Sequence, residues 1–220
     1  MTGSSREFRW EEDRVNKIKY FFQQSWLLIV AAFIFGVLIA SANAAWREKI
    51  YYNLNVYKFN KLAKEVLPQA ANFEDALQNM TIETPSGKKV TTNVKKALDE
   101  NGDIIGWAFI CKGAGFQDQI QLILVVDKSF EKIIGYGVLS SNETPGFGDK
   151  IKNSYYRDQF KGAPVGPLTL TKTGNPETID SDIVAISGAT VSSTAVVNII
   201  NEFLPAVKEK MQAEGLIGNE

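Results

Sequence analysis

The apolar and polar positions of the chain separate one long apolar segment from a domain of mixed pattern. Residues 20–46 carry no charged side chain, and their most apolar part runs from Trp26 to Ala40. A helix of about 20 apolar residues spans the hydrocarbon core of a bilayer, and Trp26 and Trp46 stand near the ends of the segment, where aromatic rings favour the interface. The pattern therefore predicts a transmembrane helix over 26–45.

A cleaved signal peptide is the competing interpretation, because residues 42–44 read Ala-Asn-Ala, the small-x-small form of a cleavage site. We expect a retained anchor, since the chain starts at Met1 and keeps the segment. Five Lys or Arg residues precede the segment and five follow it within 20 residues, so the positive-inside rule gives no orientation. The short tail before a signal-like apolar run favours an N-terminus inside the cell. This predicts a cytoplasmic tail over 1–25 and an extracytoplasmic domain over 46–220.

Shorter periodicities predict the elements of that domain. In chain order they are a helix over 46–66 stopped by Pro68, a short helix near 72–79, strands over 88–94, 104–111, 119–127 and 132–140, a helical stretch over 152–160, a loop over 161–182 with a strand at 167–172, and a helix from 191. The nearly continuous apolar run 120–126 is typical of a central buried strand, and 127–129 predicts a hairpin turn. Pro205 should kink or split the last helix. Strands joined mostly by hairpins, with helices at both ends, predict an α+β fold with a largely antiparallel sheet flanked by helices.

Composition narrows the chemistry that this domain can perform. Lys and Arg number 24 and Asp and Glu 25, for a net charge of −1, so nothing indicates a nucleic-acid partner. The chain has no histidine, which excludes Ser-His-Asp catalysis and His-ligated metals. Its single cysteine, Cys111, excludes an internal disulfide and a metal cluster held by this chain alone. Redox chemistry would therefore require an organic cofactor, and we expect no catalytic residue and no metal site.

The first candidate site is the segment 187–194, Ser-Gly-Ala-Thr-Val-Ser-Ser-Thr, which lies between a short apolar run and the last helix. The start of a helix exposes unpaired N–H groups and a partial positive charge, so it binds phosphate readily, and Gly188 lets the backbone approach a ligand. Hydroxyl residues also cap helices, and on the sequence alone a cap by Thr190 or Ser192 is the simpler interpretation.

The second candidate site is the segment 143–150, Glu-Thr-Pro-Gly-Phe-Gly-Asp-Lys, which follows the strand over 132–140. Two glycines and a proline fix an unusual loop, and Phe147 between the glycines could cover a planar ligand. The alternative is an ordinary turn with a buried Phe. A third glycine-rich turn at 112–116 lacks the strand–turn–helix context of a dinucleotide-binding motif, and we interpret it as a loop that could line a pocket.

Together the two candidate sites resemble the FMN-binding domain family. The family's attachment motif, Ser/Thr-Gly-Ala-Thr followed by small hydroxyl residues, matches 187–193, and its Glu-Thr-Pro-Gly-Leu-Gly loop matches 143–148 with Phe147 in place of Leu. Motif spacing, chain length and the single membrane helix are similar to those of the G subunits of Rnf-type ion-translocating electron-transport complexes. The C subunit of the sodium-pumping NADH:quinone reductase is the near neighbour. The resemblance covers most of 46–212.

The resemblance implies a covalent flavin. The last Thr of the attachment motif, here Thr190, would carry FMN through a phosphoester bond that a separate flavin transferase makes with FAD as donor. Glu143 and Thr144 would contact the flavin ring, and Phe147 would flank it. The remaining cofactor-binding candidates belong to the same two motifs: Ser187, Gly188, Ala189, Ser192, Ser193 and Gly146.

The resemblance also implies a function and its partners. The chain would relay electrons between ferredoxin and NAD in the cytoplasmic membrane of a bacterium or archaeon, coupled to Na⁺ or H⁺ movement through the other membrane subunits of an Rnf-type complex. Its partners would be those subunits, the lipid bilayer and the flavin transferase. Two departures from the family pattern are Ser141, where many members have His, and Val184, where many have Asp. The first concerns one ring contact, and the second concerns recognition by the transferase.

Two other functions stay open on the sequence. The first keeps the same chemistry, with the chain as the C subunit of the quinone reductase. The second is a membrane-anchored binding or assembly module without a redox role, in which 187–194 is only a helix cap and 143–148 only a turn. An anchored hydrolase is disfavoured, because the sequence has no histidine and shows no nucleophile–base pair.

Overall fold

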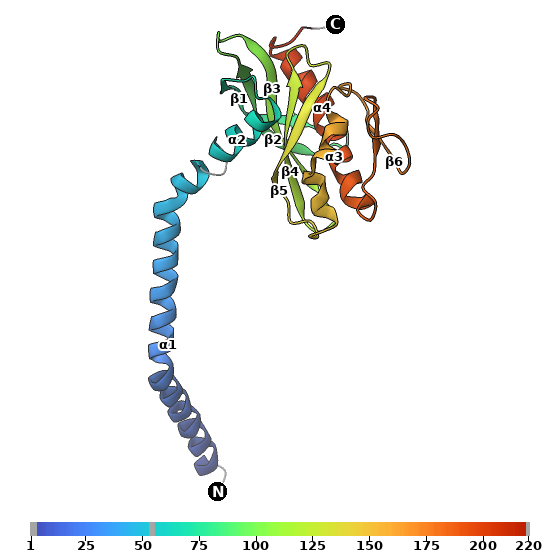
Figure 1. The fold of residues 1–220 in the computed structure, drawn as a ribbon. Helices are drawn as coiled ribbons and strands as arrows, with labels where there is room; N and C mark the ends of the chain where they lie inside the picture. The colour runs from blue at the N-terminus through green and yellow to red at the C-terminus, as the bar shows by residue number, and fades with distance from the viewer. Residues whose placement is uncertain (1–3, 53–55, 219–220) are drawn as a thin grey trace. The chain divides into compact units, whose positions relative to one another are not determined.

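The computed structural model describes residues 4–52 and 56–218, and the chain divides after residue 53 into an N-terminal unit and a larger unit (Figure 1). The described part of the N-terminal unit is one helix, α1, from Ser4–Tyr52. Its stretch Gln23–Arg47 is long and apolar enough to cross a membrane, and none of that stretch is buried. The transmembrane helix predicted over 26–45 lies inside it. The boundaries of tail, span and domain stay predictions.

The larger unit is built on one antiparallel sheet whose five strands follow the chain order. The strands are β1 (Asn72–Glu83), β2 (Lys89–Leu98), β3 (Ile104–Ala114), β4 (Gln119–Asp127) and β5 (Ile133–Ser140). This order confirms the four predicted strands, the predicted hairpin between β4 and β5, and the α+β class.

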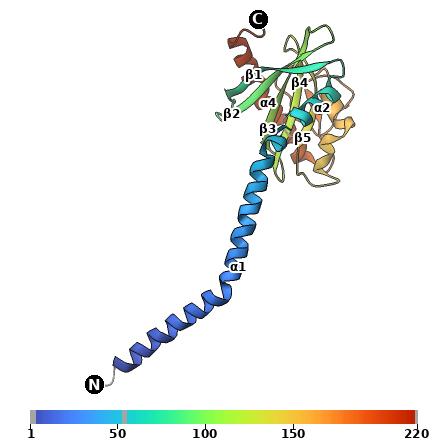
Figure 2. The same ribbon diagram turned by 90° about the vertical axis from the view of Figure 1, so that its left-hand side faces the viewer.

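Two apolar layers cover the two faces of the sheet, and strand β4 shows why. Its side chains alternate, so that Leu122, Leu124 and Val126 enter one core while Ile123 and Val125 enter the other. The first core lies under helix α4 (Thr190–Ala213), with helix α3 (Ser154–Arg157) on the same face (Figure 1). The second core lies under helix α2 (Lys58–Val66), which packs on the opposite face (Figure 2). A strand buried on both sides has to be apolar throughout, which is why its run is continuous.

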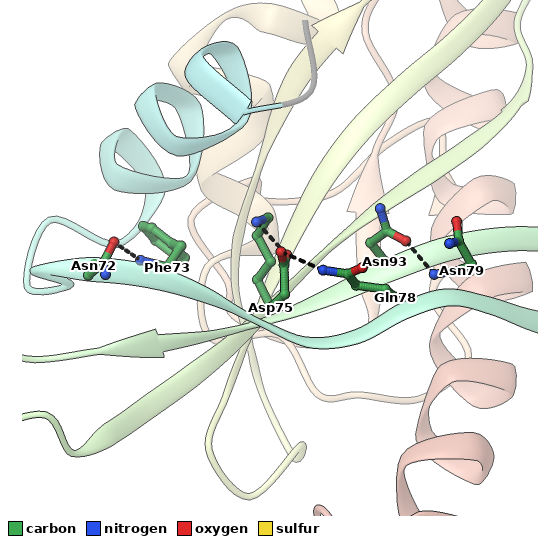
Figure 3. A network of polar contacts seen from close by, with 7 residues as sticks. Asn72, Phe73, Asp75, Gln78, Asn79 and Asn93 are labelled. Carbon is green, nitrogen blue, oxygen red and sulfur yellow. Dashed lines mark hydrogen bonds and ion pairs between the residues drawn. The ribbon is translucent and has the colours of Figure 1, made fainter. Parts of the chain in front are cut away.

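The prediction of a short helix near 72–79 is wrong, because these residues form most of β1. Figure 3 shows the polar contacts that hold this irregular edge strand. The carboxylate of Asp75 accepts from Lys95 Nζ at 2.5 Å and from Gln78 Nε2 at 3.0 Å. Asn93 Oδ1 accepts from the backbone N–H of Asn79, which has φ of +51°, at 2.7 Å. Pairing with β2 and these cross-strand bonds override the local helix propensity.

The first predicted helix of the domain, over 46–66, is two pieces in the described residues. Helix α1 continues to Tyr52 and α2 runs over Lys58–Val66, while residues 53–55 of the prediction lie outside the described residues. Between β5 and α4, the helical stretch predicted over 152–160 is found as the end of a 3-10 turn, η2 (Gly148–Lys152), then α3 and a second 3-10 turn, η3 (Asp158–Phe160).

The segment predicted as a loop over 161–182 holds a strand, β6 (Thr169–Thr171), inside the predicted 167–172. It pairs in parallel with β7 (Asp182–Val184), a partner that the sequence pattern did not reveal. The side-chain amide of Gln159 completes β7, since it donates to Val184 O at 3.2 Å and accepts from Val184 N at 2.8 Å. This anchored strand leads directly into the start of α4.

Helix α4 carries the candidate site and is fixed to the sheet along its length. Pro205 lies inside the helix without splitting it; of the predicted kink or split, the split is wrong and the kink stays a prediction. Phe203, Leu204, Ala206 and Val207 around the proline are buried and hold the helix in place despite the lost N–H donor. The start of the helix is therefore presented on a rigid support.

Candidate functional site

An open pocket of about 500 Å³ lies at the N-terminal end of α4. Three segments that are distant in sequence form its walls: the β3–β4 turn, the loop after β5 and the start of α4. The lining residues are Phe116, Thr144, Phe147, Gly148, Gly188, Thr190, Val191 and Ser192. The two motifs singled out in the sequence thus meet at one pocket, together with the third glycine-rich turn.

The first turn of α4 has no side-chain cap. Ala189 occupies the N-cap position, and Gly188 before it adopts φ of +78°, a left-handed conformation that favours glycine. Among the described residues, no oxygen accepts from the backbone N–H of Thr190, Val191 or Ser192. The interpretation of Thr190 or Ser192 as a helix cap is therefore wrong. The donors and the positive end of the helix dipole are available to an anion.

The hydroxyl groups of this turn have different surroundings. Ser193 is fully buried, where its Oγ donates to Ala189 O and accepts from Ile186 N, both at 3.0 Å. Ser192 is buried and donates to Glu143. Ser187 is exposed and lines a separate depression of about 290 Å³. Thr190 is exposed on the pocket wall, and no hydrogen bond of its hydroxyl is found within the described residues. Among the hydroxyl residues of this turn, Thr190 is the exposed one that lines the pocket.

The loop after β5 supplies an aromatic wall. Gly146 adopts φ of +77° and turns the chain so that Phe147 stands 56% exposed beside the pocket. The Phe147 ring packs on the turn at Gly188, where an added Cβ would lie 3.5 Å from it. Lys150 Nζ lies 5.8 Å from the centre of the same ring. The interpretation of this loop as an ordinary turn with a buried Phe does not fit this exposure.

Three lining residues lie in the predicted segments but were not named as cofactor-binding candidates: Phe116, Gly148 and Val191. The expectation that the turn at 112–116 could line a pocket is confirmed at Phe116. Phe116 is 65% exposed and faces the pocket from the third glycine-rich turn, whose place in the site only the sheet register reveals. Val191 is 56% exposed, an unusual state for an apolar side chain in the first turn of a packed helix. That exposure is visible only in the folded domain.

Five predicted site residues do not line the pocket: Ser187, which lies in the separate depression, and four that support the pocket or lie beside it. Ala189 is the N-cap, Ser193 is buried inside the first turn, Gly146 makes the loop turn, and Glu143 is 4% exposed with its carboxylate bonded inside the protein. Contact of Glu143 and Thr144 with a flavin ring stays a prediction. Of the two, Thr144 lines the pocket.

A buried tyrosine supports the first turn of α4 from below. Tyr156 in α3 donates its hydroxyl to Ser193 O at 3.0 Å. Burial raises the pKa of the Tyr156 phenol, so the group stays protonated and remains a donor. Its ring packs edge-on against Phe160, with 5.5 Å between ring centres. The turn that presents Thr190 is thus held by a packed aromatic core.

Comparisons with known proteins match the part of the chain that forms this pocket. The family model of the FMN-binding domain matches residues 115–205, the stretch from the β3–β4 turn into α4. The G subunit of the ion-translocating oxidoreductase complex of Methanosarcina acetivorans is 35% identical over 138 residues, covering 63% of this chain and 69% of the relative. The G subunit of the Na⁺-translocating ferredoxin:NAD⁺ oxidoreductase complex of Acetobacterium woodii is 26% identical over 190 residues, covering 83% of this chain and 89% of the relative.

Solved structures share the fold. The crystal structure of NqrC from Shewanella oneidensis superposes with a TM-score of 0.52 at 22% identity, covering 66% of this chain and 73% of that one. The C subunit of the Na⁺-translocating NADH-quinone reductase from Parabacteroides distasonis gives a TM-score of 0.51 at 16% identity, covering 76% and 92%. The fold is that of these C subunits, and the match to the family model of the FMN-binding domain includes the three segments that line the pocket. Since the relative at 35% identity is spanned over more than two thirds of its length, the chain belongs to the family of G subunits of ion-translocating oxidoreductase complexes.

Proposed function

We propose that the chain is the FMN-carrying electron-transfer subunit of an Rnf-type ferredoxin:NAD oxidoreductase, and that Thr190 bears FMN through a phosphoester bond. The observation that carries the proposal is the uncapped first turn of α4, with its N–H donors and the exposed Thr190 hydroxyl on one pocket wall. The names of the G-subunit relatives support the assignment to such a complex.

The residues present fit the chemistry of FMN. A phosphate on Thr190 would lie at the helix N-terminus, where the N–H groups of Thr190, Val191 and Ser192 favour negative charge. Phe116 and Phe147 supply exposed rings that can pack on a planar heterocycle. When bound, FMN accepts and donates one or two electrons, which suits a relay between single-electron centres.

Attachment requires another protein. A Thr hydroxyl is a weak nucleophile at neutral pH, and the chain has no histidine to activate it. In the proposed step, Thr190 Oγ forms a bond to the FMN phosphorus of FAD, the pyrophosphate bond breaks, and AMP leaves. The hydroxyl proton passes to a base of the flavin transferase. This chain contributes the exposed hydroxyl and the helix N-terminus that stabilises the product phosphate.

The membrane helix would hold the flavin domain beside the other subunits of the complex. We propose that the N-terminus faces the cytoplasm and the domain the opposite side, where a covalent link prevents loss of the cofactor by diffusion. Protease added to right-side-out vesicles should then digest the domain beyond residue 60. Full protection of the domain would contradict this orientation.

The test of the covalent flavin uses the full chain produced together with the transferase. The wild type should fluoresce on a denaturing gel and be heavier than the bare chain by one FMN less one water. Thr190→Ala should be dark and unmodified, while Thr190→Ser, which keeps a hydroxyl, should recover part of the label. A dark wild type of unmodified mass would overturn the proposal and leave an anchored module without a redox role.

A further inference from the structure

A buried carboxylate lies behind the pocket without a cation beside it. Glu143 is 4% exposed, and it belongs to none of the ion pairs formed by the described residues. Its Oε1 accepts from the backbone N–H of Phe116 and of Gln117, both at 3.0 Å. Its Oε2 accepts from the hydroxyl of Ser192. A buried carboxylate is costly unless such charge-assisted bonds satisfy it.

The three donors belong to two walls of the pocket, and Glu143 belongs to the third. Phe116 and Gln117 form the β3–β4 turn, Ser192 lies in the first turn of α4, and Glu143 itself begins the loop that carries Phe147. One side chain therefore ties together the three segments that define the pocket. Its position in contact with the first turn of α4 also places negative charge near the positive end of the helix dipole.

Two glycines leave the space that this arrangement occupies. A Cβ on Gly115 would collide with Glu143 Oε1 and lie 2.6 Å from Asp118 O. A Cβ on Gly148 would lie 2.5 Å from Ser192 Oγ and 3.0 Å from Glu143 Oε2. Gly148 has no left-handed φ, so the need for glycine there comes from this contact and not from backbone conformation. The buried bond network thus occupies space that glycine leaves in two separate loops, and at Gly115 the backbone of Asp118 excludes a Cβ as well.

We propose that Glu143 and Ser192 are a positioning pair, which holds the three pocket walls in register and acts on the flavin only through Phe116, Phe147 and the first turn of α4. The inference rests on the proposed function for the identity of the ligand. It differs from a direct contact of Glu143 with the flavin ring, because both carboxylate oxygens already have partners inside the protein. The pair defines a rigid pocket from loops that would otherwise move independently.

The role can be tested without the cofactor, by hydrogen exchange of the Phe116 and Gln117 amides in the unloaded full chain in detergent. Glu143→Ala removes their acceptor, so exchange at both should rise by about tenfold or more. Ser192→Ala leaves Oε2 without its partner and should raise exchange at the same amides by a smaller factor. Glu143→Gln keeps an acceptor and gains an N–H that can donate to Ser192 Oγ, so it should recover most of the protection.

The matched control is Glu202→Ala, because the Glu202 carboxylate on α4 likewise accepts from a backbone N–H and a Ser hydroxyl, those of Ser86 between β1 and β2. It should leave Phe116 and Gln117 protected. Exchange in β4, whose side chains fill both cores, reports whether each variant is folded. Unchanged protection of Phe116 and Gln117 in a folded Glu143→Ala chain would overturn the proposal.

The loaded chain gives the second readout, the anisotropy of flavin fluorescence and the midpoint potential. Glu143→Ala and Ser192→Ala should both lower the anisotropy, and Glu143→Gln should restore it. If Glu143→Gln instead shifts the potential as much as Glu143→Ala while Ser192→Ala changes nothing, Glu143 acts directly on the flavin and the positioning role is refuted. A dark wild type would refute the proposed function, whereas the exchange result would still decide the positioning pair.

Discussion

Helix α4 borders two depressions of nearly equal size. The pocket at its N-terminus measures about 500 Å³, and a groove along its side measures about 540 Å³. The groove is the more polar of the two by its side chains, which include Ser86, Lys88, Lys112, Asn198 and Glu202. Size and polarity alone would therefore favour the groove as the binding site.

The difference lies in how far the polar groups are already satisfied. In the groove, Glu202 accepts from the backbone N–H and hydroxyl of Ser86 at 3.3 and 2.7 Å. Asn201 exchanges two hydrogen bonds of 2.8 Å with the backbone of Leu168. At the N-terminal pocket, the donors of the first helical turn have no acceptor among the described residues. Open donors beside an exposed hydroxyl, rather than volume, distinguish the N-terminal pocket from the groove.

The largest expected effect is the loss of bound flavin and of electron transfer. It should follow a substitution in the N-terminal pocket but not one in the groove. Thr190→Val keeps the shape of the side chain and removes the hydroxyl, so it should abolish bound flavin and stop electron transfer in the assembled complex while the fold persists. Asn198→Ala, an exposed change in the groove, should leave both unchanged. The measurement is ferredoxin-dependent NAD reduction by membrane vesicles, with in-gel fluorescence. Full activity of Thr190→Val would contradict the assignment.

The second effect is a loss of free energy of unfolding, which should differ between a buried and an exposed aromatic residue around α4. Phe203 is 2% exposed in the core under the helix, so Phe203→Ala should lower the free energy of unfolding by about 3–5 kcal/mol. Phe147 is 56% exposed, so Phe147→Ala should change it by less than about 0.5 kcal/mol. Urea unfolding of the full chain in detergent, followed by near-ultraviolet circular dichroism, measures both. Similar losses in the two variants would show that Phe147 is a core residue.

A smaller effect concerns the support of the first turn of α4. Tyr156→Phe removes the bond to Ser193 O and leaves a buried carbonyl with one partner fewer, which should cost about 1 kcal/mol of stability. Tyr155→Phe is the matched control, because Tyr155 is 53% exposed. The same unfolding measurement applies, and equal stability of the two variants would argue against support from Tyr156.

The smallest effect belongs to the groove and depends on pH. The hydroxyl of Ser86 holds the pKa of Glu202 below its ordinary value. A carboxyl group with a lowered pKa in the folded state contributes stability above its unfolded pKa and loses that contribution as the pH falls through the folded pKa. Glu202→Gln should therefore be slightly less stable than wild type at pH 7, and the difference should shrink as the pH falls below about 4.3, the ordinary pKa of a Glu side chain. A difference that stays constant from pH 7 through this acidification would contradict the carboxylate's role.

The sequence predicted the parts of the fold whose pattern is set locally. Strand β4 is continuously apolar because both faces are buried, and the turn after it is fixed by Asp127, which accepts from the backbone N–H of Glu131 and Lys132. Strand β1 was missed because its identity depends on pairing with β2 and not on its own residues. Strand β6 was predicted within 167–172, but its parallel partner β7 was missed for the same reason.

The candidate site likewise contains residues that a local motif predicts and residues that only the packing of distant segments brings together. Gly188, Thr190 and Phe147 were predicted because a motif of adjacent residues carries them, and the structure brings them to one pocket. The turn at 112–116 was expected to line a pocket, but only the antiparallel register of β3 and β4 shows that Phe116 joins the same pocket as the other two motifs. The inward direction of the Glu143 carboxylate is likewise a consequence of packing, since its donors lie 26, 27 and 49 residues away in sequence.

The most direct test of the central claim is the position of the FMN group in the wild-type chain produced with the transferase. Trypsin should release residues 173–208 as one peptide, which contains Thr190 together with seven other Ser and Thr residues. Fragmentation mass spectrometry assigns the added mass to one of them. The account predicts FMN, less one water, on Thr190. The same mass on any other residue of the peptide, or an unmodified peptide, would contradict it.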